Sequence, residues 1–447
     1  MPAPKNIILL TADSLRVDRL GCYAPSPKPS LTPNLDNLAR RGILFTDVYA
    51  QGPYTAFSLP SIFTGKYPCR LRPMTRAIRW EQPTGVLVEG TPTFVEMLRA
   101  GGYHTAAFHS NPLVSRLFGF DKGFDVFYDD VLASSRSLPS KVKLNAARLQ
   151  RIFRVDPYLG ARALNAKVLR WLQTAPQPFF LWVHYMDTHG PYLARKVLKY
   201  VSRGERLWQK SKNSPTYITP AERAELLHNY HNQIEALDAE LGQLWQAFAD
   251  QGLFDSSLII FSADHGEEFF EHGGYSHTPK LYDELLHVPM IVSLPGAAPA
   301  VVSELAALIQ IAPTIVDYAG LSDVDAAFDV GSLLPLLCGQ FHRSPEFVLA
   351  EAGAEAHANV CVRTKQWKLI FRDKGAVTEL YDLSRDPLEK LNLAEEHPHR
   401  VRELAAHLAA HRNGSCGGSA AEMAAGLEMT PAEEQLVAER LHDLGYL

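Results

Sequence analysis

Two acidic residues follow apolar runs that are typical of buried strands, at distant places in the chain. Asp264 and His265 come directly after the run 258–261, and Asp13 follows the run 6–12. The carboxyl ends of parallel strands meet at one edge of a sheet, where ligands bind. Carboxylate oxygen and imidazole nitrogen are common ligands of divalent metals. The sequence therefore predicts one metal site assembled from two strand ends.

The composition describes a large globular chain. Its 447 residues are 46% hydrophobic and carry a formal charge of -5, which is ample for a large core and argues against a general nucleic-acid binder. No stretch approaches the roughly 20 apolar residues that span a bilayer, and the apolar run after Lys5 is too short for a signal peptide. Five cysteines without metal-type spacing predict reduced thiols and a cytoplasmic protein.

Strand-like and helix-like segments alternate along the first three quarters of the chain. The expected strands are 43–46, 103–108 and 179–184, and the expected helices are 33–41, 93–100 and 220–251. The first of these helices has Thr32 as its expected cap and Pro33 at its first position. This alternation predicts an α/β fold with a mostly parallel sheet that is covered by helices on both faces.

The pattern changes near residue 340. The later segments are short strand-like runs at 361–363, 367–370 and 379–383, a helix from about 397 to 411, a glycine- and serine-rich segment at 413–419, and a short charged helix at the end. The composition of 413–419 is typical of a flexible linker. We expect two domains, a catalytic domain at 1–340 and a small α+β domain at 341–447.

Several motifs, in the same order along the chain, resemble those of the sulfatase family within the alkaline phosphatase superfamily. They are the segments 13–23, 32–36, 41–45, 63–68, 184–192 and 264–267, and the run 379–383 with 386–387 and 392–393 after it. The resemblance implies an alkaline-phosphatase-like central sheet between helices, with a smaller C-terminal antiparallel sheet and a helix. It also implies a metal-dependent ester hydrolase.

The nucleophile segment departs from the family pattern. Sulfatases carry Cys or Ser in a Cys/Ser-x-Pro-x-Arg run, and this residue is oxidised to formylglycine. Alignment without gaps places Thr55 at the nucleophile, with Phe57 and Leu59 at the proline and arginine positions. Threonine cannot become formylglycine, so none is expected. A second alignment places Ser58 at the nucleophile, but it opens a gap and puts Ile62 at the arginine. Thr55 is preferred, although a helix-capping threonine would look the same in sequence.

The resemblance implies that Asp13, Thr55, Asp264 and His265 bind one divalent metal ion. Typical sulfatases begin with two adjacent aspartates, whereas the second position is Ser14 in this chain. A ligand set with an imidazole and few carboxylates favours Mn²⁺ or Zn²⁺, while Ca²⁺ or Mg²⁺ stays possible. A second metal would need further acidic and histidine ligands, and one metal is expected.

The resemblance also implies which residues surround the substrate. His189 is expected to contact the ester oxygens or to protonate the leaving group. The expected substrate-binding residues are His184, Asp187, His277, Lys280 and Asn111. His109 and Asn111 occupy the positions of a Lys-x-His pair in sulfatases, so much of the usual sulfate-binding set is missing.

These departures favour a hydrolase that cleaves phosphodiesters or phosphonate monoesters through a metal-activated threonine. This resembles the phosphodiesterase and phosphonate monoester hydrolase branch of the superfamily. The expected partner is a small anionic ester. Three alternatives stay open, namely a sulfuric ester hydrolase without formylglycine, a transferase of phosphoryl head groups, and a degenerate binding module.

Overall fold

The structure is a computed structural model of the chain. It describes residues 6–24, 30–71, 91–129, 158–192, 198–321, 327–340, 345–352, 359–372 and 375–415. The predicted charged helix at the end of the chain lies outside these residues.

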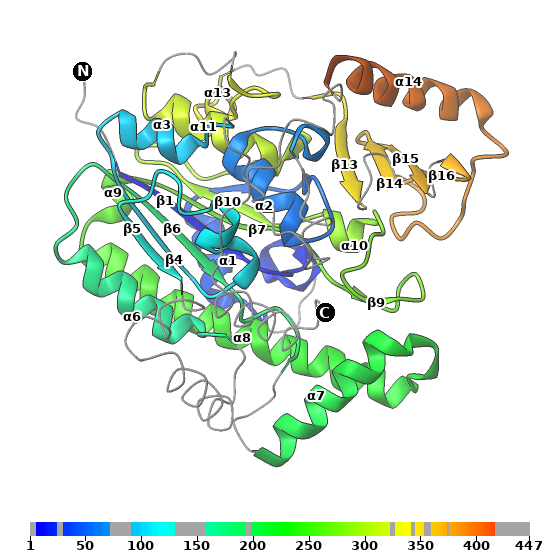
Figure 1. The fold of residues 1–447 in the computed structure, drawn as a ribbon, viewed down its shortest axis with the longest axis horizontal. Helices are drawn as coiled ribbons and strands as arrows, with labels where there is room; N and C mark the ends of the chain where they lie inside the picture. Colours follow the sequence, from blue (N-terminus) through cyan, green and yellow to red (C-terminus); the bar gives the residue numbers. More distant parts are fainter. Residues whose placement is uncertain are drawn as a thin grey trace.

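A large central sheet organises the described residues (Figure 1). Its strands, in spatial order, are β11 (Ala300–Val302), β2 (Ile43–Phe45), β10 (Met290–Ser293), β7 (Ser257–Ala263), β1 (Asn6–Ala12), β6 (Phe179–Tyr185), β4 (His104–His109) and β5 (Val126–Asp129). Neighbouring strands are parallel except where β10 pairs with β7 and with β2. The mostly parallel sheet predicted from the sequence is confirmed.

Helices cover both faces of this sheet (Figure 1). One layer holds α1 (Pro33–Arg41), α6 (Ala161–Leu172) and α8 (Pro220–Asp250), and the other holds α2 (Thr55–Thr64), α3 (Phe94–Ala100) and α11 (Ile311–Tyr318). Every residue of β1, β6 and β7 is buried as a result. A strand covered on both faces must be apolar along its whole length, which explains the continuous apolar runs in the sequence.

Thr32 is the N-cap residue of α1 as predicted, but another side chain accepts the first N–H groups of the helix. Thr32 makes no capping hydrogen bond, and its hydroxyl instead accepts the N–H of Gly21 at 3.0 Å. Asp238 of α8 takes the role, since its carboxylate accepts the N–H groups of Asn34 at 3.0 Å and Leu35 at 2.9 Å. Thr32 thus occupies the predicted N-cap position, but its side chain does not make the capping bond, because a tertiary contact supplies the acceptor.

A second, antiparallel sheet lies beside the large one. Its strands are β13 (Val348–Ala352), β14 (Asn359–Arg363), β15 (Trp367–Arg372) and β16 (Val377–Asp382), in that order. One face packs against α14 (Pro398–Ser415), and the other contributes to an apolar cluster with Tyr49 and Ile309. The predicted linker is wrong at 413–415, where α14 continues, and its remainder lies outside the described residues. The boundary near residue 340 stays a prediction.

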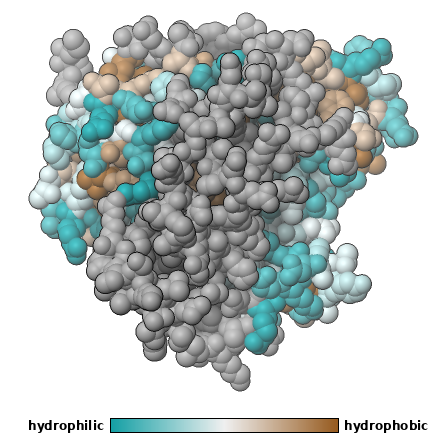
Figure 2. All heavy atoms as spheres, viewed as in Figure 1, coloured by the Kyte–Doolittle hydropathy of each residue, from teal (hydrophilic) through white to brown (hydrophobic). Residues whose placement is uncertain are grey.

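No described helix combines the length and the apolar character that a membrane crossing requires. In the orientation of Figure 1, hydrophilic side chains make up much of the coloured surface at the left and right margins (Figure 2). The cytoplasmic location expected from the cysteines stays a prediction.

An aromatic cluster fixes α2 against the sheet. Phe63 of α2 is 1% exposed, and its ring centroid lies 4.7 Å from Trp182 of β6 and 5.3 Å from Phe94 of α3. The same ring also meets the edge of Phe120 at 5.5 Å. Because α2 begins at Thr55, this packing determines where that residue lies.

Removing the central ring of this cluster should destabilise the protein. We expect Phe63→Ala to lower the free energy of unfolding by about 3–5 kcal/mol, because the surrounding rings cannot collapse into the space. Tyr217→Ala is the control, since Tyr217 is 76% exposed and its loss should cost less than about 0.5 kcal/mol. Urea unfolding of both variants measures the difference, and equal midpoints would contradict the proposed role of the cluster.

Candidate metal centre and active site

The parallel ladder of β1 continues past its end and aligns two acidic residues. Ala12 of β1 pairs with Ala263 of β7, and the N–H of Asp264 donates to the carbonyl of Ala12 at 3.2 Å. On the other side, the N–H of Asp13 donates to the carbonyl of Tyr185 at 2.8 Å. The two carboxylates thus leave neighbouring strands at the same level, as the apolar runs before them predicted.

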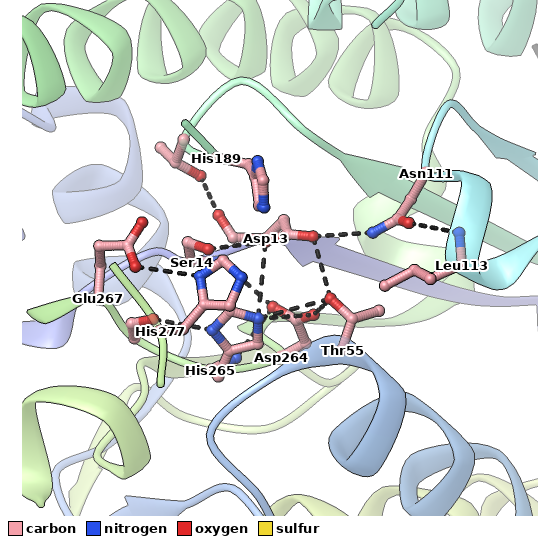
Figure 3. Close-up of polar contacts among 12 residues, drawn as sticks. Asp13, Ser14, Thr55, Asn111, Leu113, His189, Asp264, His265, Glu267 and His277 are labelled. Atoms are coloured by element: carbon pink, nitrogen blue, oxygen red, sulfur yellow. Dashed lines mark hydrogen bonds and ion pairs between the residues drawn. The ribbon is translucent and has the colours of Figure 1, made fainter. Parts of the chain in front are cut away.

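Asp13, Asp264 and His265 form a buried cluster whose possible ligand atoms all lie within 4.8 Å of one another (Figure 3). His265 Nε2 lies 3.6 Å from a carboxylate oxygen of each aspartate. Its other nitrogen, Nδ1, lies 2.8 Å from the carbonyl of Gly266, which can only accept, so Nδ1 carries the proton. Nε2 therefore offers a lone pair to the centre of the cluster when the ring is neutral.

The electrostatics of this cluster fit a bound cation. Both aspartates are 0% exposed, and buried like charges repel strongly. Burial, followed by the charge of Asp13, raises the pKa of Asp264. Burial alone would also raise the pKa of Asp13, but nearby histidines, led by His189, hold it well below its usual value. A divalent cation would stabilise both carboxylates in their charged form, and the donor set of two carboxylates and an imidazole suits such an ion.

Thr55 is the first residue of α2, and its hydroxyl points into the cluster (Figure 3). Oγ1 lies 2.9 Å from Asp264 Oδ2 and 3.2 Å from Asp13 Oδ2, both within hydrogen-bonding distance. It also lies 3.5 Å from His265 Nε2. The hydroxyl thus faces all three of the other expected ligands and does not cap the helix.

Ser58, the alternative nucleophile, lies one turn further along α2. It is 0% exposed, and its hydroxyl has no hydrogen-bond partner in the part of the chain that the structure describes. Its hydroxyl therefore makes no hydrogen bond to any of the three cluster residues. The geometry therefore favours Thr55 as the hydroxyl of the site.

Hydrogen-bond donors surround the oxygens of Asp13. Ser14 Oγ donates to Asp13 Oδ1 at 2.7 Å, and Asn111 Nδ2 donates to Asp13 Oδ2 at 2.9 Å. Ser14 has a positive φ of 58°, which brings its N–H to 3.3 Å from Asp264 Oδ1. The residue that replaces the second aspartate of the family pattern thus bonds to both cluster carboxylates.

Three histidines border the cluster. His184 on β6 places Nε2 at 3.5 Å from Asp13 Oδ2. The rings of His265 and His277 are 4.8 Å apart, and those of His277 and His189 are 5.1 Å apart. Burial, the largest influence, lowers the pKa of His189 to about 4. His189 Nδ1 lies 2.5 Å from the carbonyl of Gly190, so in the neutral ring Nδ1 carries the proton and Nε2 carries the lone pair.

Two expected substrate-binding residues are held by other groups. Both carboxylate oxygens of Asp187 accept the N–H of Ala161 at 3.0 Å, at the start of α6. Lys280 Nζ lies 2.9 Å from both carboxylate oxygens of Glu268 and 2.8 Å from the carbonyl of His272. The structure therefore brings His184, His277 and Asn111 to the cluster but engages Asp187 and Lys280 elsewhere.

Glu267 is a site residue that the sequence analysis quoted but gave no role. It is fully buried and accepts the hydroxyl proton of Tyr192 at 2.5 Å, and its Oε1 lies 3.0 Å from His277 Nδ1. Burial opposes its ionisation, but His277 and these hydrogen bonds lower the pKa of Glu267. Its position two residues after His265 was the available signal.

The loop after β7 is held by the short helix α10 (Asp283–Leu286). The N–H groups of Gly266 and Glu267 donate to the carbonyls of Leu285 and Glu284 at 2.8 and 3.0 Å. A Cβ at Gly266 would lie 2.0 Å from the carbonyl oxygen of Glu284, so only glycine permits this approach. The position of His265 therefore depends on α10.

The positions that should carry cations in a sulfate-binding set are buried and uncharged. Leu59 is 0% exposed. His109 stacks on Trp182 with ring centroids 5.7 Å apart, and burial lowers the pKa of His109 to about 3. A neutral ring at this position offers little to the anionic sulfate group of an ester.

Comparison with known proteins identifies the family. The sulfatase family model matches residues 5–321, and a model described as the C-terminal part of N-sulphoglucosamine sulphohydrolase matches residues 271–413. The chain belongs to the sulfatase family. It is an ester hydrolase with the alkaline-phosphatase-like fold predicted from its motifs.

Individual relatives agree with this assignment over most of the chain. Human arylsulfatase A is 27% identical, across 87% of this chain and 83% of the relative, and choline-sulfatase of Rhizobium meliloti (strain 1021) is 25% identical across 87% and 82%. The structure of the phosphonate monoester hydrolase of Agrobacterium radiobacter superposes with a TM-score of 0.70 at 21% identity, covering 92% of this chain and 96% of that chain. Sulfatases are thus among its relatives, and a phosphonate monoester hydrolase shares its fold.

Loss of one cluster carboxylate should release the metal. We expect Asp264→Asn to reduce the bound divalent metal by one equivalent per chain, because the amide offers a weaker, uncharged ligand. Asp187→Asn is the matched control, since Asp187 also follows a central strand but contacts α6. Elemental analysis of the purified proteins measures the difference. Full metal content in Asp264→Asn, or equal loss in both variants, would contradict the proposed centre.

Proposed function

We propose that this sulfatase-family enzyme hydrolyses a phosphodiester or a phosphonate monoester, with Thr55 as the nucleophile. The observation that carries the proposal is the position of Thr55 Oγ1, which lies 2.9–3.5 Å from Asp13, Asp264 and His265. Sulfatases use formylglycine at this position, and threonine cannot be converted to it. The reaction must therefore proceed through a hydroxyl.

Asp13, Asp264, His265 and Thr55 would hold a divalent metal ion, for which Mn²⁺ or Zn²⁺ is our preference. When bound, such an ion lowers the pKa of a coordinated hydroxyl and neutralises charge on the ester oxygens. Thr55 Oγ1 then attacks phosphorus, and its proton has carboxylate acceptors at 2.9 and 3.2 Å. The bond from phosphorus to the leaving oxygen breaks, and its electron pair leaves with that oxygen. Water subsequently hydrolyses the phosphothreonine.

His189 is proposed to act on the leaving group. Its Nε2 carries the lone pair of the neutral ring, because Nδ1 donates its proton to the carbonyl of Gly190. Nε2 can therefore take up a proton from solvent and give it to the departing oxygen. His277 lies beside it and is oriented by Glu267, which supports a role in contacting the ester. His184 and Asn111 would hold Asp13 and border the substrate.

Thr55 also favours a phosphorus ester over a sulfate ester as the substrate. Formylglycine releases sulfate by breakdown of a hemiacetal without attack on sulfur, whereas a sulfated threonine would have to be cleaved at sulfur. A phosphothreonine can be hydrolysed by attack of water at phosphorus. The fold itself does not separate these reactions, since it accommodates both sulfatases and a phosphonate monoester hydrolase.

Replacing Thr55 should abolish phosphodiester hydrolysis. We expect Thr55→Ala to lower turnover of bis(para-nitrophenyl) phosphate by at least about 10³-fold, because Thr55 Oγ1 faces both aspartates and His265, whereas the hydroxyl of Ser14 is engaged in donating to Asp13. Ser58→Ala is the matched control and should stay within about threefold of wild type. A covalent phosphoryl adduct on Thr55, trapped by acid quench, should appear by mass spectrometry in the wild-type protein.

Assays with para-nitrophenyl sulfate separate the alternatives. Sulfate turnover that survives Thr55→Ala would overturn the threonine mechanism and favour Ser58 or water. Phosphoryl transfer to added alcohol in place of water would identify a transferase. A protein that hydrolyses neither ester would argue against the proposal, whether or not it binds metal. If it also binds no metal, the result would favour a binding module.

The decrease in rate caused by replacing His189 should depend on the leaving group of the ester. We expect His189→Gln to reduce hydrolysis of a phenyl phosphodiester by about 10²–10⁴-fold, because phenolate needs a proton on departure. The loss for the para-nitrophenyl ester should be much smaller, since para-nitrophenolate leaves as a stable anion. The ratio of kcat/KM for the two esters in each protein measures this. Equal losses would show that His189 contacts the ester without protonating the leaving group.

A further inference from the structure

We propose a second metal site, specific for Zn²⁺, formed by Cys69, Glu351 and His411 outside the catalytic cluster. The possible ligand atoms of these three residues lie within 4.8 Å of one another. They come from the 3₁₀ turn Pro68–Arg70 after α2, from β13 and from α14. The site therefore joins the segment that follows the nucleophile helix to both elements of the C-terminal layer.

The distances match ligands that share one ion. Cys69 Sγ lies 3.5 Å from His411 Nε2, and Glu351 Oε1 lies 3.9 Å from the same nitrogen. Zn–S and Zn–N bonds of about 2.3 and 2.0–2.1 Å place sulfur and nitrogen about 3.6 Å apart at a tetrahedral angle. Small side-chain adjustments would bring all three atoms to bonding distance.

The geometry argues against a nucleophilic cysteine with a histidine base. In such an arrangement the acid contacts the ring nitrogen opposite to the one that faces the nucleophile. Here the thiol and the carboxylate of Glu351 approach the same nitrogen, His411 Nε2. Two groups that become anionic converge on one lone pair, which is the arrangement around a shared cation.

Burial and charge favour the same conclusion. The side chains of His411 and Glu351 are 12% and 11% exposed, and Cys69 is partly buried. A thiolate and a carboxylate balance the charge of one divalent ion, so the loaded site is neutral where it is shielded from water. The thiolate selects Zn²⁺ over Mg²⁺, Mn²⁺ and Ca²⁺, which prefer oxygen ligands. The thiol proton is released to solvent on binding.

Neighbouring residues hold the ligands in place without the ion. The ring of Tyr67 packs edge-on against that of His411, with centroids 4.5 Å apart. The turn that carries Cys69 is fixed by Asp329, which accepts the N–H of Tyr67 at 3.0 Å and pairs with Arg70 at 2.8 Å. A preorganised set of this kind loses little freedom when it binds an ion.

Cobalt substitution of the full-length protein tests the site. After removal of metal with a chelator, reloading with Co²⁺ should produce a thiolate-to-cobalt charge-transfer band in the near ultraviolet. The catalytic cluster cannot give this band, because its ligands are oxygen and nitrogen. We expect the band to disappear in Cys69→Ser and to persist in Cys338→Ser, a control at an exposed cysteine. It should also persist in the Asp13→Asn/Asp264→Asn double variant.

Zinc content and thermal stability provide a second readout. Cys69→Ser and His411→Gln should each bind one equivalent of Zn²⁺ less than Cys338→Ser. Added Zn²⁺ should raise the Tm of the Asp13→Asn/Asp264→Asn variant, but not that of the same variant with Cys69→Ser added, because only the native state presents the three ligands together. A wild-type protein without the charge-transfer band, or a band that survives Cys69→Ser, would overturn the proposal.

Discussion

The site depends on one constraint, which is that the parallel pairing of β1 and β7 forces two carboxylates together in a buried place. Asp13 and Asp264 leave adjacent strands at the same level, and neither is exposed. Two like charges without water repel, so the surrounding structure must supply positive charge or hydrogen-bond donors. Ser14 and Asn111 donate to Asp13, and the hydroxyl of Thr55 faces both aspartates. A divalent ion would complete this compensation, which supports the proposed metal centre.

Hydrogen bonds to backbone carbonyls determine how two of the histidines are oriented. His265 and His189 each donate a hydrogen bond from Nδ1 to the carbonyl of the following glycine. In both rings, Nε2 is therefore on the side away from that carbonyl. In His265 this nitrogen is directed at the two carboxylates, as a metal ligand requires. In His189 it is the group that can carry a proton. The same hydrogen bond to a glycine carbonyl thus orients both rings. Their proposed roles differ because different groups surround each Nε2.

Much of the fold and the centre of the site could be predicted because they depend on local sequence. Apolar runs and a terminal Asp mark β1 and β7, and parallel pairing brings their ends together. The roles of single side chains were harder to predict, because they depend on partners far away in the chain. Lys280 is neutralised by Glu268, Asp187 holds the start of α6, and Asp238 makes the capping bonds in place of the Thr32 side chain. The cysteines showed no metal-type spacing, because the groups that lie beside Cys69 are far away in the chain. Glu351 and His411 follow it by 282 and 342 positions.

The C-terminal sheet helps to position the loop that carries His265, although the two are far apart in the sequence. The loop that carries His265 rests on α10, and α10 is anchored by Asp283. This carboxylate pairs with Lys368 of β15 at 2.7 Å, and Lys368 is fully buried and also lies 2.8 Å from Glu389. Because a buried ammonium between two carboxylates tolerates little displacement, the second sheet fixes α10, and α10 in turn fixes the metal-binding loop. The small sheet is therefore part of the structure that positions the candidate metal cluster, although none of its described residues belongs to that cluster.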